Sequence, residues 1–311
     1  MVALLLVGGA VVVGRLAPLV RQVARTTVPE SGWTGVRMTA AEPDRSVWLD
    51  GDGPRLAVDV YDARGVPLAA VLLVHGNRAA GVRDGFCRLL GRSLSRRGVE
   101  VHALDLRGFG RSDAAPVDQP LRADDLLADL ARGAEHLERA APPGLPRGLL
   151  GHSLGAILAL RFPARPGWRI VSLEPGPDLR ERVVELPAPD LPVFTRKLEA
   201  TVRGGIKDEP AVRSLYGELD PERPGPDVAP GSVLILQGWN VSVAHRESMR
   251  AAAAAHQGSV VRFVDSADHE FGVVSAGRRL VYPEKLTDTL ANICSGFIIS
   301  GAIPADFAGE R

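Results

Sequence analysis

The length and composition of the chain exclude several classes of protein. With 311 residues, 45% of them apolar, the chain can bury a core as one large domain or as two smaller ones. Lys+Arg and Asp+Glu both number 37, so the formal net charge is zero and no positive excess favours nucleic acid. The two cysteines, Cys87 and Cys294, match neither a disulfide framework nor a metal-ligand spacing, and we expect two buried thiols.

An apolar segment, residues 1–25, opens the chain. Residues 1–14 carry no charged side chain. A membrane-spanning helix needs about 20 apolar residues, a length reached here only if Arg15 extends to the membrane surface. Arg21 and Arg25 would then hold the following domain on the cytoplasmic side. We expect membrane association through residues 1–20, and the alternative is an apolar helix packed on a soluble cytoplasmic domain.

From residue 44 on, short apolar runs alternate with longer amphipathic ones, which predicts a single α/β domain over 44–311 with a mostly parallel sheet. Strands are expected at residues 47–49, 56–61, 69–74, 98–106, 148–150, 169–173, 233–237 and 260–264, the first two as an antiparallel pair. Helices are expected at residues 121–140, 157–161, 246–255 and 285–300. Residues 175–230, rich in proline and charge, are typical of an inserted lid.

The pentapeptide at residues 151–155, Gly-His-Ser-Leu-Gly, joins an expected strand to an expected helix. A nucleophile placed on such a sharp turn needs glycine on both sides, because a side chain there would block the passage of the backbone. The turn exposes the hydroxyl of Ser153 and places the N–H of Leu154 at a helix N-terminus, where it can stabilise an oxyanion. We therefore expect Ser153 to be a nucleophile.

Two further motifs end expected strands in the same order as in a known family. Residues 73–77 read Leu-Val-His-Gly-Asn, and residues 105–112 read Asp-Leu-Arg-Gly-Phe-Gly-Arg-Ser. Together with the serine motif, they make the chain from about residue 45 resemble the α/β-hydrolase superfamily. The resemblance implies an α/β-hydrolase fold, a second oxyanion N–H from Asn77, and a mainly structural role for the motif at residues 105–112.

The resemblance also implies a histidine beyond the last strand, because the triad of this family runs serine, acid, histidine along the chain. His269 follows the strand expected at 260–264 by a short turn. Of the other six histidines, four precede Ser153 and two, His245 and His256, border a helix. We therefore expect His269 to be the general base.

The acid departs from the family pattern, because the turn after residues 233–237 contains no carboxylate. Asn240 lies in that turn, and its amide oxygen can orient a histidine without offsetting the imidazolium charge. Some members of the family carry the acid after the preceding strand, where this chain has Glu174. Asp268 is ranked below Glu174, since neighbouring side chains in an extended turn point apart. We favour Glu174, with Asn240 as the alternative.

These residues imply hydrolysis of a small-molecule carboxylic ester, or of a thioester or amide, through an acyl-enzyme and without a cofactor or metal. Two alternatives stay open. A hydrolase-fold binding protein with little or no turnover is suggested by the missing carboxylate after residues 233–237. Acyl transfer to an alcohol is compatible with the same scaffold, since fold does not determine reaction. The sequence determines neither the substrate nor the oligomeric state.

Overall fold

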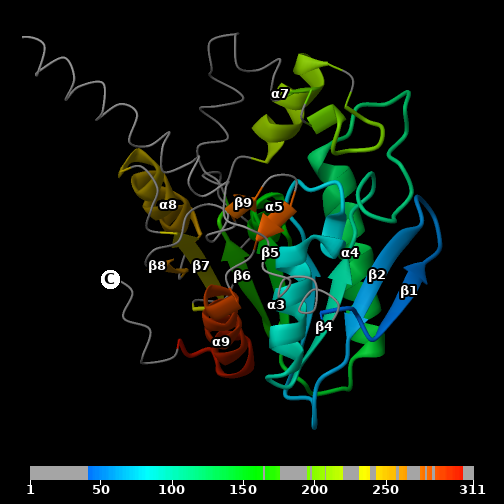
Figure 1. Ribbon diagram of the computed structural model, residues 1–311. Helices are drawn as coiled ribbons and strands as arrows, with labels where there is room; N and C mark the ends of the chain where they lie inside the picture. Colours follow the sequence, from blue (N-terminus) through cyan, green and yellow to red (C-terminus); the bar gives the residue numbers. More distant parts are fainter. Residues whose placement is uncertain are drawn as a thin grey trace, which may run out of the picture.

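The fold is built on one eight-stranded sheet in the order β1-β2-β4-β3-β5-β6-β7-β8 (Figure 1). This computed structural model describes residues 41–163, 165–175, 195–196, 198–206, 208–219, 231–238, 243–256, 259–264, 274–276, 279–281 and 284–303. The strands of the sheet are β1 (Arg45–Leu49), β2 (Leu56–Tyr61), β3 (Ala69–Val74), β4 (Val99–Leu104), β5 (Arg147–His152), β6 (Trp168–Leu173), β7 (Val233–Gly238) and β8 (Val260–Val264). The helices are α3 (Gly85–Ser95), α4 (Ala123–Ala140), α5 (Leu154–Arg161), α7 (Glu209–Glu218), α8 (Val243–Ala255) and α9 (Glu284–Ser300).

The sheet is mostly parallel, as the alternation of apolar runs predicted. β1 pairs antiparallel with β2, and β2 pairs antiparallel with β4. Every other neighbouring pair, from β4 across to β8, is parallel. Because parallel strands share a direction, the segments that follow β3 to β8 all leave the sheet at one edge. That edge therefore gathers all the motifs singled out in the sequence.

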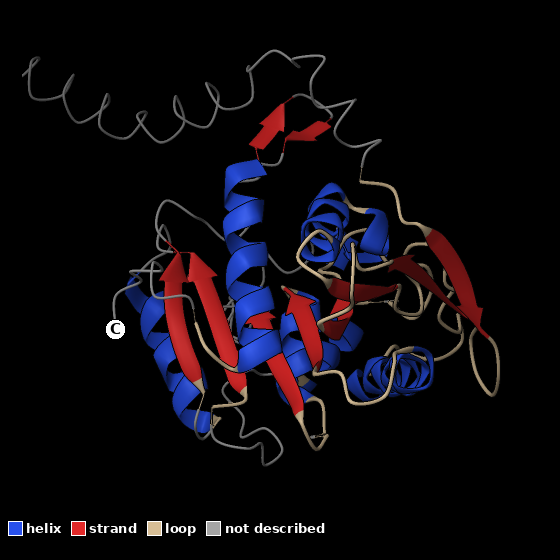
Figure 2. Ribbon diagram, turned by 90° about the horizontal axis from the view of Figure 1, so that it is seen from below, coloured by secondary structure: helices blue, strands red, loops and turns tan. Residues whose placement is uncertain are grey.

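Helices cover both faces of the sheet, and the sheet separates the core into two layers (Figure 2). One layer packs α3 and α9 against the sheet through residues such as Leu90, Leu94 and Phe297. The other contains α4, α5, α7 and α8, with Leu130 and Ile157 among its buried residues. β3 is fully buried, which explains its uninterrupted run of apolar side chains. The α/β-hydrolase fold class predicted from the motifs is confirmed.

Two helices were not expected from the sequence. α3 contains glycine at position 91, where a Cβ would lie only 2.9 Å from the ring of Tyr61, so the helix approaches β2 closely. The carboxylate of Asp84 caps this helix by accepting the N–H of Phe86 at 3.1 Å. α7 lies in the proline-rich segment and is capped by Asp208, which accepts the N–H of Ala211 at 2.9 Å. The structure also contains a small hairpin of β9 (Val274–Ala276) and β10 (Arg279–Val281).

The connection from β6 to β7 contains the segment predicted as a lid. Within it, α7 lies beside the start of α4 (Figure 1), where a carboxylate oxygen of Glu218 accepts the N–H of Ala123 at 3.0 Å. The N–H of Arg203 donates to the carbonyl of Gly108 at 2.8 Å, which ties the segment to the loop after β4. Much of residues 175–230 lies outside the described residues, so the lid stays a prediction.

A buried ion pair joins the loop after β4 to helix α4. The guanidinium and the backbone N–H of Arg107 donate to the carboxylate of Asp129 at 2.8 to 3.1 Å. The Asp129 side chain is fully buried, and Asp125, which is partly exposed, contacts the same guanidinium at 2.8 Å. Such a fork of charged hydrogen bonds fixes the position of the loop.

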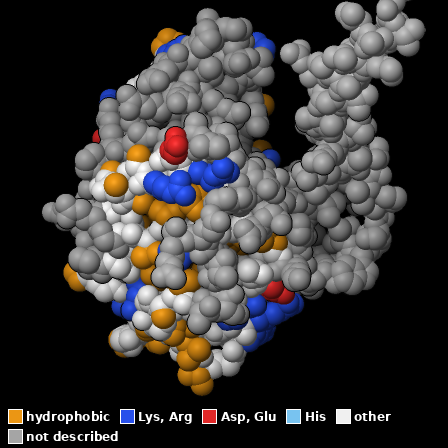
Figure 3. Space-filling view, turned by 90° about the vertical axis from the view of Figure 1, so that its left-hand side faces the viewer, with side chains coloured by type: hydrophobic (Ala, Val, Ile, Leu, Met, Phe, Trp, Pro, Cys, Tyr) orange, Lys and Arg blue, Asp and Glu red, His pale blue; other side chains and the backbone are white. Residues whose placement is uncertain are grey.

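On the side of α8 and α9, apolar and Lys or Arg side chains lie next to one another (Figure 3). Among the described residues, no helix has the length and apolar character needed to cross a membrane. Residues 1–25 lie outside that part, and their membrane association stays a prediction.

Candidate active site

The turn between β5 and α5 holds Ser153 in an uncommon backbone conformation. β5 ends at His152 and α5 begins at Leu154, so the serine lies between strand and helix as the sequence predicted. Its backbone angles are φ 51° and ψ −112°. A residue with a Cβ adopts a positive φ only at a cost of about 1–3 kcal/mol, which the surrounding structure must offset. Residues in such strained conformations cluster at functional sites.

The two glycines of this turn allow three backbone segments to pack closely. A Cβ on Gly151 would collide with the backbone of Gly155. A Cβ on Gly155 would lie 2.5 Å from the carbonyl oxygen of Val74 and 2.7 Å from that of His75. Larger side chains at these positions would therefore push the start of α5 away from the end of β3. Glycine is required here for close approach, as the motif predicted.

The loop after β3 lies directly against Ser153. A Cβ on Gly76 would lie 3.0 Å from the Cβ of Ser153, and the N–H of Gly155 donates to the carbonyl of His75 at 3.1 Å. Within the described part of the chain, the backbone N–H groups of Asn77 and Leu154 donate to no backbone carbonyl. This leaves both N–H groups without a backbone acceptor, and their role in holding an oxyanion stays a prediction.

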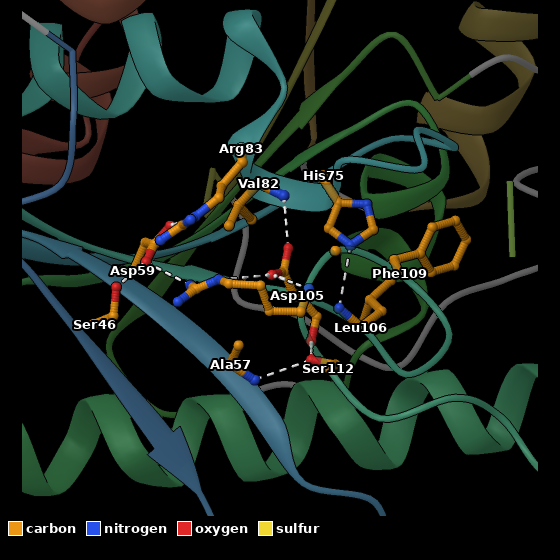
Figure 4. Close-up of polar contacts among 12 residues, drawn as sticks. Ser46, Ala57, Asp59, His75, Val82, Arg83, Asp105, Leu106, Phe109 and Ser112 are labelled. Atoms are coloured by element: carbon orange, nitrogen blue, oxygen red, sulfur yellow. Dashed lines mark hydrogen bonds and ion pairs between the residues drawn. The ribbon is translucent and has the colours of Figure 1, made fainter. Parts of the chain in front are cut away.

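His75 is a buried residue that fixes this loop and takes no part in the chemistry proposed below (Figure 4). Its Nδ1 lies 2.6 Å from the carbonyl of Gly76, and its Nε2 accepts the N–H of Leu106 at 3.1 Å. Nε2 is thus an acceptor and Nδ1 carries the proton, so the ring is neutral. Burial lowers the pKa of His75 and favours the same neutral form. The ring of Phe109 packs on it at 4.9 Å.

Asp105 holds together the loops that surround the site (Figure 4). Its carboxylate accepts the N–H of Val82 at 2.7 Å and that of Arg111 at 3.0 Å. The carboxylate fills the space beside Gly81 and Gly110, both of which have a positive φ. Burial raises the pKa of Asp105, and the two N–H donors and Arg111 oppose that shift. The motif at residues 105–112 is therefore structural here, as the resemblance implied.

The register of three neighbouring strands brings Ser153 and Glu174 together. His152 on β5 pairs with Leu173 on β6, and Leu173 pairs with Leu236 on β7. One residue further along each strand, Ser153, Glu174 and Gln237 follow in one row across the edge of the sheet. The N–H of Ser153 donates to the carbonyl of Leu173 at 2.9 Å, which fixes the backbone of the serine next to Glu174.

Glu174 is fully buried and has a positive φ of 54°. Among the described residues, only Glu174 and Ser153 combine a side chain with a positive φ. The N–H of Glu174 donates to the carbonyl of Leu236 at 2.9 Å. The two oxygens of its carboxylate accept hydrogen bonds from the Nε2 of Gln237 and the N–H of Gly238, respectively. The carboxylate therefore lies at the end of β7, the place where the family pattern expects the acid.

The remaining candidates lie outside the described residues. Asn240 follows the end of β7 by two positions, and Asp268 and His269 follow the end of β8. β7 and β8 pair in parallel, with Gly238 opposite Val264, so both segments leave the sheet at the edge that carries Ser153. Their participation in the site stays a prediction.

Comparisons with known proteins agree with this geometry. The family profile described as serine aminopeptidase, S33, matches residues 65–176, which include β3, the loop after β4, the serine turn and Glu174. The family match and the fold both support the α/β-hydrolase superfamily. No curated protein matches the chain by sequence.

Solved structures share the α/β-hydrolase fold over most of the chain. A soluble variant of monoglyceride lipase from Saccharomyces cerevisiae, in complex with a substrate analog, is 14% identical with a TM-score of 0.57, covering 83% of this chain and 96% of its own. Est1E from Butyrivibrio proteoclasticus, with bound ferulic acid, is 14% identical with a TM-score of 0.54, covering 82% and 99%. XC6422 from Xanthomonas campestris, a serine hydrolase without lid, is 17% identical with a TM-score of 0.50, covering 85% and 96%.

One described residue of this site, Gln237, was missed by the sequence analysis. It appeared only as the last residue of an expected strand. The signal that could have identified it is a polar side chain at the carboxyl end of a central strand, in a run of otherwise apolar residues. Its partner is 63 positions away in sequence, so only the pairing of β6 with β7 reveals the contact.

Proposed function

We propose that this protein is a serine hydrolase that cleaves a carboxylic ester through an acyl-enzyme on Ser153. The observation that carries this proposal is the strained conformation of Ser153, at φ 51°, between the ends of β5 and α5. The strain has no evident structural benefit, because a glycine at this position would adopt the same conformation without it. Exposure of a hydroxyl at the edge of the sheet is the property that the strained turn provides.

In the proposed mechanism, the Oγ of Ser153 attacks the ester carbonyl while His269 accepts its proton. The N–H groups of Asn77 and Leu154 hold the oxyanion of the tetrahedral intermediate. The intermediate collapses, the C–O bond to the alcohol breaks, and His269 returns the proton to the departing alkoxide. A water molecule, deprotonated by His269, then releases the acid and regenerates Ser153.

Glu174 is proposed as the group that orients His269 and stabilises its positive charge. A carboxylate supplies this charge, whereas the amide of Asn240 does not. The Glu174 carboxylate lies at the end of β7, and Glu174 and Ser153 follow paired residues on the adjacent strands β6 and β5; both observations support the assignment. A chain in which Asn240 served this purpose would have no chemical need for a buried carboxylate there.

The strained serine also argues against a hydrolase-fold binding protein without turnover. A chain that only binds a ligand gains nothing from a side chain with positive φ at this turn. Two of the similar structures contain bound small molecules, ferulic acid in Est1E and a substrate analog in the monoglyceride lipase. We infer a small-molecule ester as the substrate class, with thioesters and amides ranked below it. We also infer association of the full-length protein with membranes through residues 1–20.

Labelling with a fluorophosphonate tests the proposal directly, because this reagent modifies only a serine that is activated as a nucleophile. Full-length protein is expected to be labelled, and Ser153→Ala should abolish both labelling and the hydrolysis of short nitrophenyl esters. Ser300→Ala, a serine substitution at the exposed end of α9, should be labelled fully. Undiminished hydrolysis by a folded Ser153→Ala protein would overturn the assignment.

A further inference from the structure

Gln237 holds the carboxylate of Glu174 from the neighbouring strand. We propose that Gln237 is a positioning residue for the catalytic acid, and that it orients the Glu174 carboxylate for His269. This inference rests on the proposed function, since it assumes that Glu174 is the acid. It adds a residue on β7 that acts through Glu174 and does not itself contact the substrate.

The contacts of Glu174 show how this orientation arises. One carboxylate oxygen accepts a hydrogen bond from the Nε2 of Gln237, and the other accepts one from the N–H of Gly238. The two donors are consecutive residues of β7, and both Glu174 and Gln237 are fully buried. Two donors acting on different oxygens fix the carboxylate plane as well as its position.

Burying the amide of Gln237 lowers the stability of the fold relative to an apolar side chain at the same position. Among the described residues, its Oε1 is buried and has no hydrogen-bond partner. A buried acceptor without a partner costs about 1–3 kcal/mol. The rest of β7 up to this residue is apolar, and a methionine or leucine would continue that run without the cost. The benefit that offsets the cost is the N–H donated to Glu174.

The placement of these residues explains why the acid can come from β6. The turn after β7, where the family pattern carries the acid, contains no carboxylate in this chain, and the last two residues of β7, Gln237 and Gly238, act as donors. The side chain of Glu174 extends from β6 to these donors and brings its carboxylate to the end of β7. The strand that usually carries the acid therefore supplies the groups that hold it.

Substitutions at Gln237 test this role in the full-length protein. Gln237→Met removes the donor at nearly constant volume, and we expect kcat for a nitrophenyl ester to fall about 10- to 100-fold with little change in KM. Gln237→Glu introduces a carboxyl that donates to Glu174 when protonated and repels it when ionised. The activity of this variant relative to the unchanged protein should therefore fall as the pH rises, whereas that of Gln237→Met should be independent of pH.

A double-mutant cycle separates positioning from a structural effect. If Gln237 acts through Glu174, Gln237→Met should lower kcat no further in a protein that already carries Glu174→Gln. Ser172→Ala serves as a matched control, because it removes another buried polar group of the sheet edge, whose hydroxyl donates to the carbonyl of Ala156 at 3.2 Å. This variant should lose stability with little change in kcat.

The outcomes distinguish the two proposals. Fluorophosphonate labelling of the unchanged protein, together with full kcat in a folded Gln237→Met variant, would overturn the role of Gln237 and leave the serine hydrolase intact. A loss of kcat that adds fully to that of Glu174→Gln would likewise reject it. If the unchanged protein is neither labelled nor active, both proposals fail.

Discussion

Replacing Ser153 by glycine is expected to stabilise the fold while it removes the proposed nucleophile. The prediction follows from the backbone of this residue, whose φ of 51° is unfavourable for any side chain with a Cβ. Ser153→Ala is the matched variant, because alanine also lacks the hydroxyl but keeps the Cβ and therefore the strain. The difference in stability between the two variants isolates the cost of the backbone conformation.

The magnitude follows from two opposing terms. Relief of the positive φ contributes about 1–2 kcal/mol in favour of glycine. The greater backbone freedom of glycine in the unfolded chain costs about 0.5–1 kcal/mol. The glycine variant should therefore be more stable than the alanine variant by roughly 0.5–1 kcal/mol. At an ordinary helical position the sign is reversed, and Ala156→Gly, in the buried interior of α5, should lose about 1 kcal/mol or more.

Unfolding in guanidinium chloride at neutral pH measures these differences, provided that the three variants share one m-value. All variants at position 153 should be inactive on nitrophenyl esters. A Ser153→Gly protein that is less stable than Ser153→Ala would show that the turn is not strained in solution, and the main support for an activated serine would be lost.

Four further results are expected. Glu174→Gln should lower kcat by up to about 10⁴-fold, and Asn240→Ala far less, in steady-state assays; the reverse ranking would assign the acid to Asn240. Asp129→Ala should cost about 3–5 kcal/mol of unfolding free energy in denaturant titrations, because it leaves a largely buried guanidinium without its main partner. Burial and the neighbouring histidine lower the pKa of His136 from 6.5 to about 4, so as the pH falls His136 is protonated in the unfolded chain before it is protonated in the folded protein. Stability should therefore decline as the pH falls from about 6.5 to 4, and less so in His136→Gln. Deletion of residues 1–20 should move the protein from the membrane pellet to the supernatant on centrifugation, and full-length protein that stays in the supernatant without detergent would contradict this expectation.

The sequence by itself determined the strands of the eight-stranded sheet, most of the helices and the turn that holds Ser153. These features depend on local patterns: apolar runs bounded by turn residues, and glycines at a turn that excludes side chains. β3 and β8 have the bounds that their apolar runs predicted, and Ser153 lies between a strand and a helix as its motif requires. Helix α3 was missed because the glycine at position 91 lowers helix propensity, and its benefit, close packing on Tyr61, is a tertiary contact.

Only the tertiary structure decided how the proposed acid is held. The sequence offered Glu174, Asn240 and Asp268 as candidates. The sequence alone does not distinguish a catalytic carboxylate at the end of a strand from one that is exposed to solvent. The register of β5, β6 and β7 brings Ser153, Glu174 and Gln237 into one row, and it buries the carboxylate between donors from β7. Strand order and register are set by packing between segments distant in the chain, so no local pattern encodes this contact.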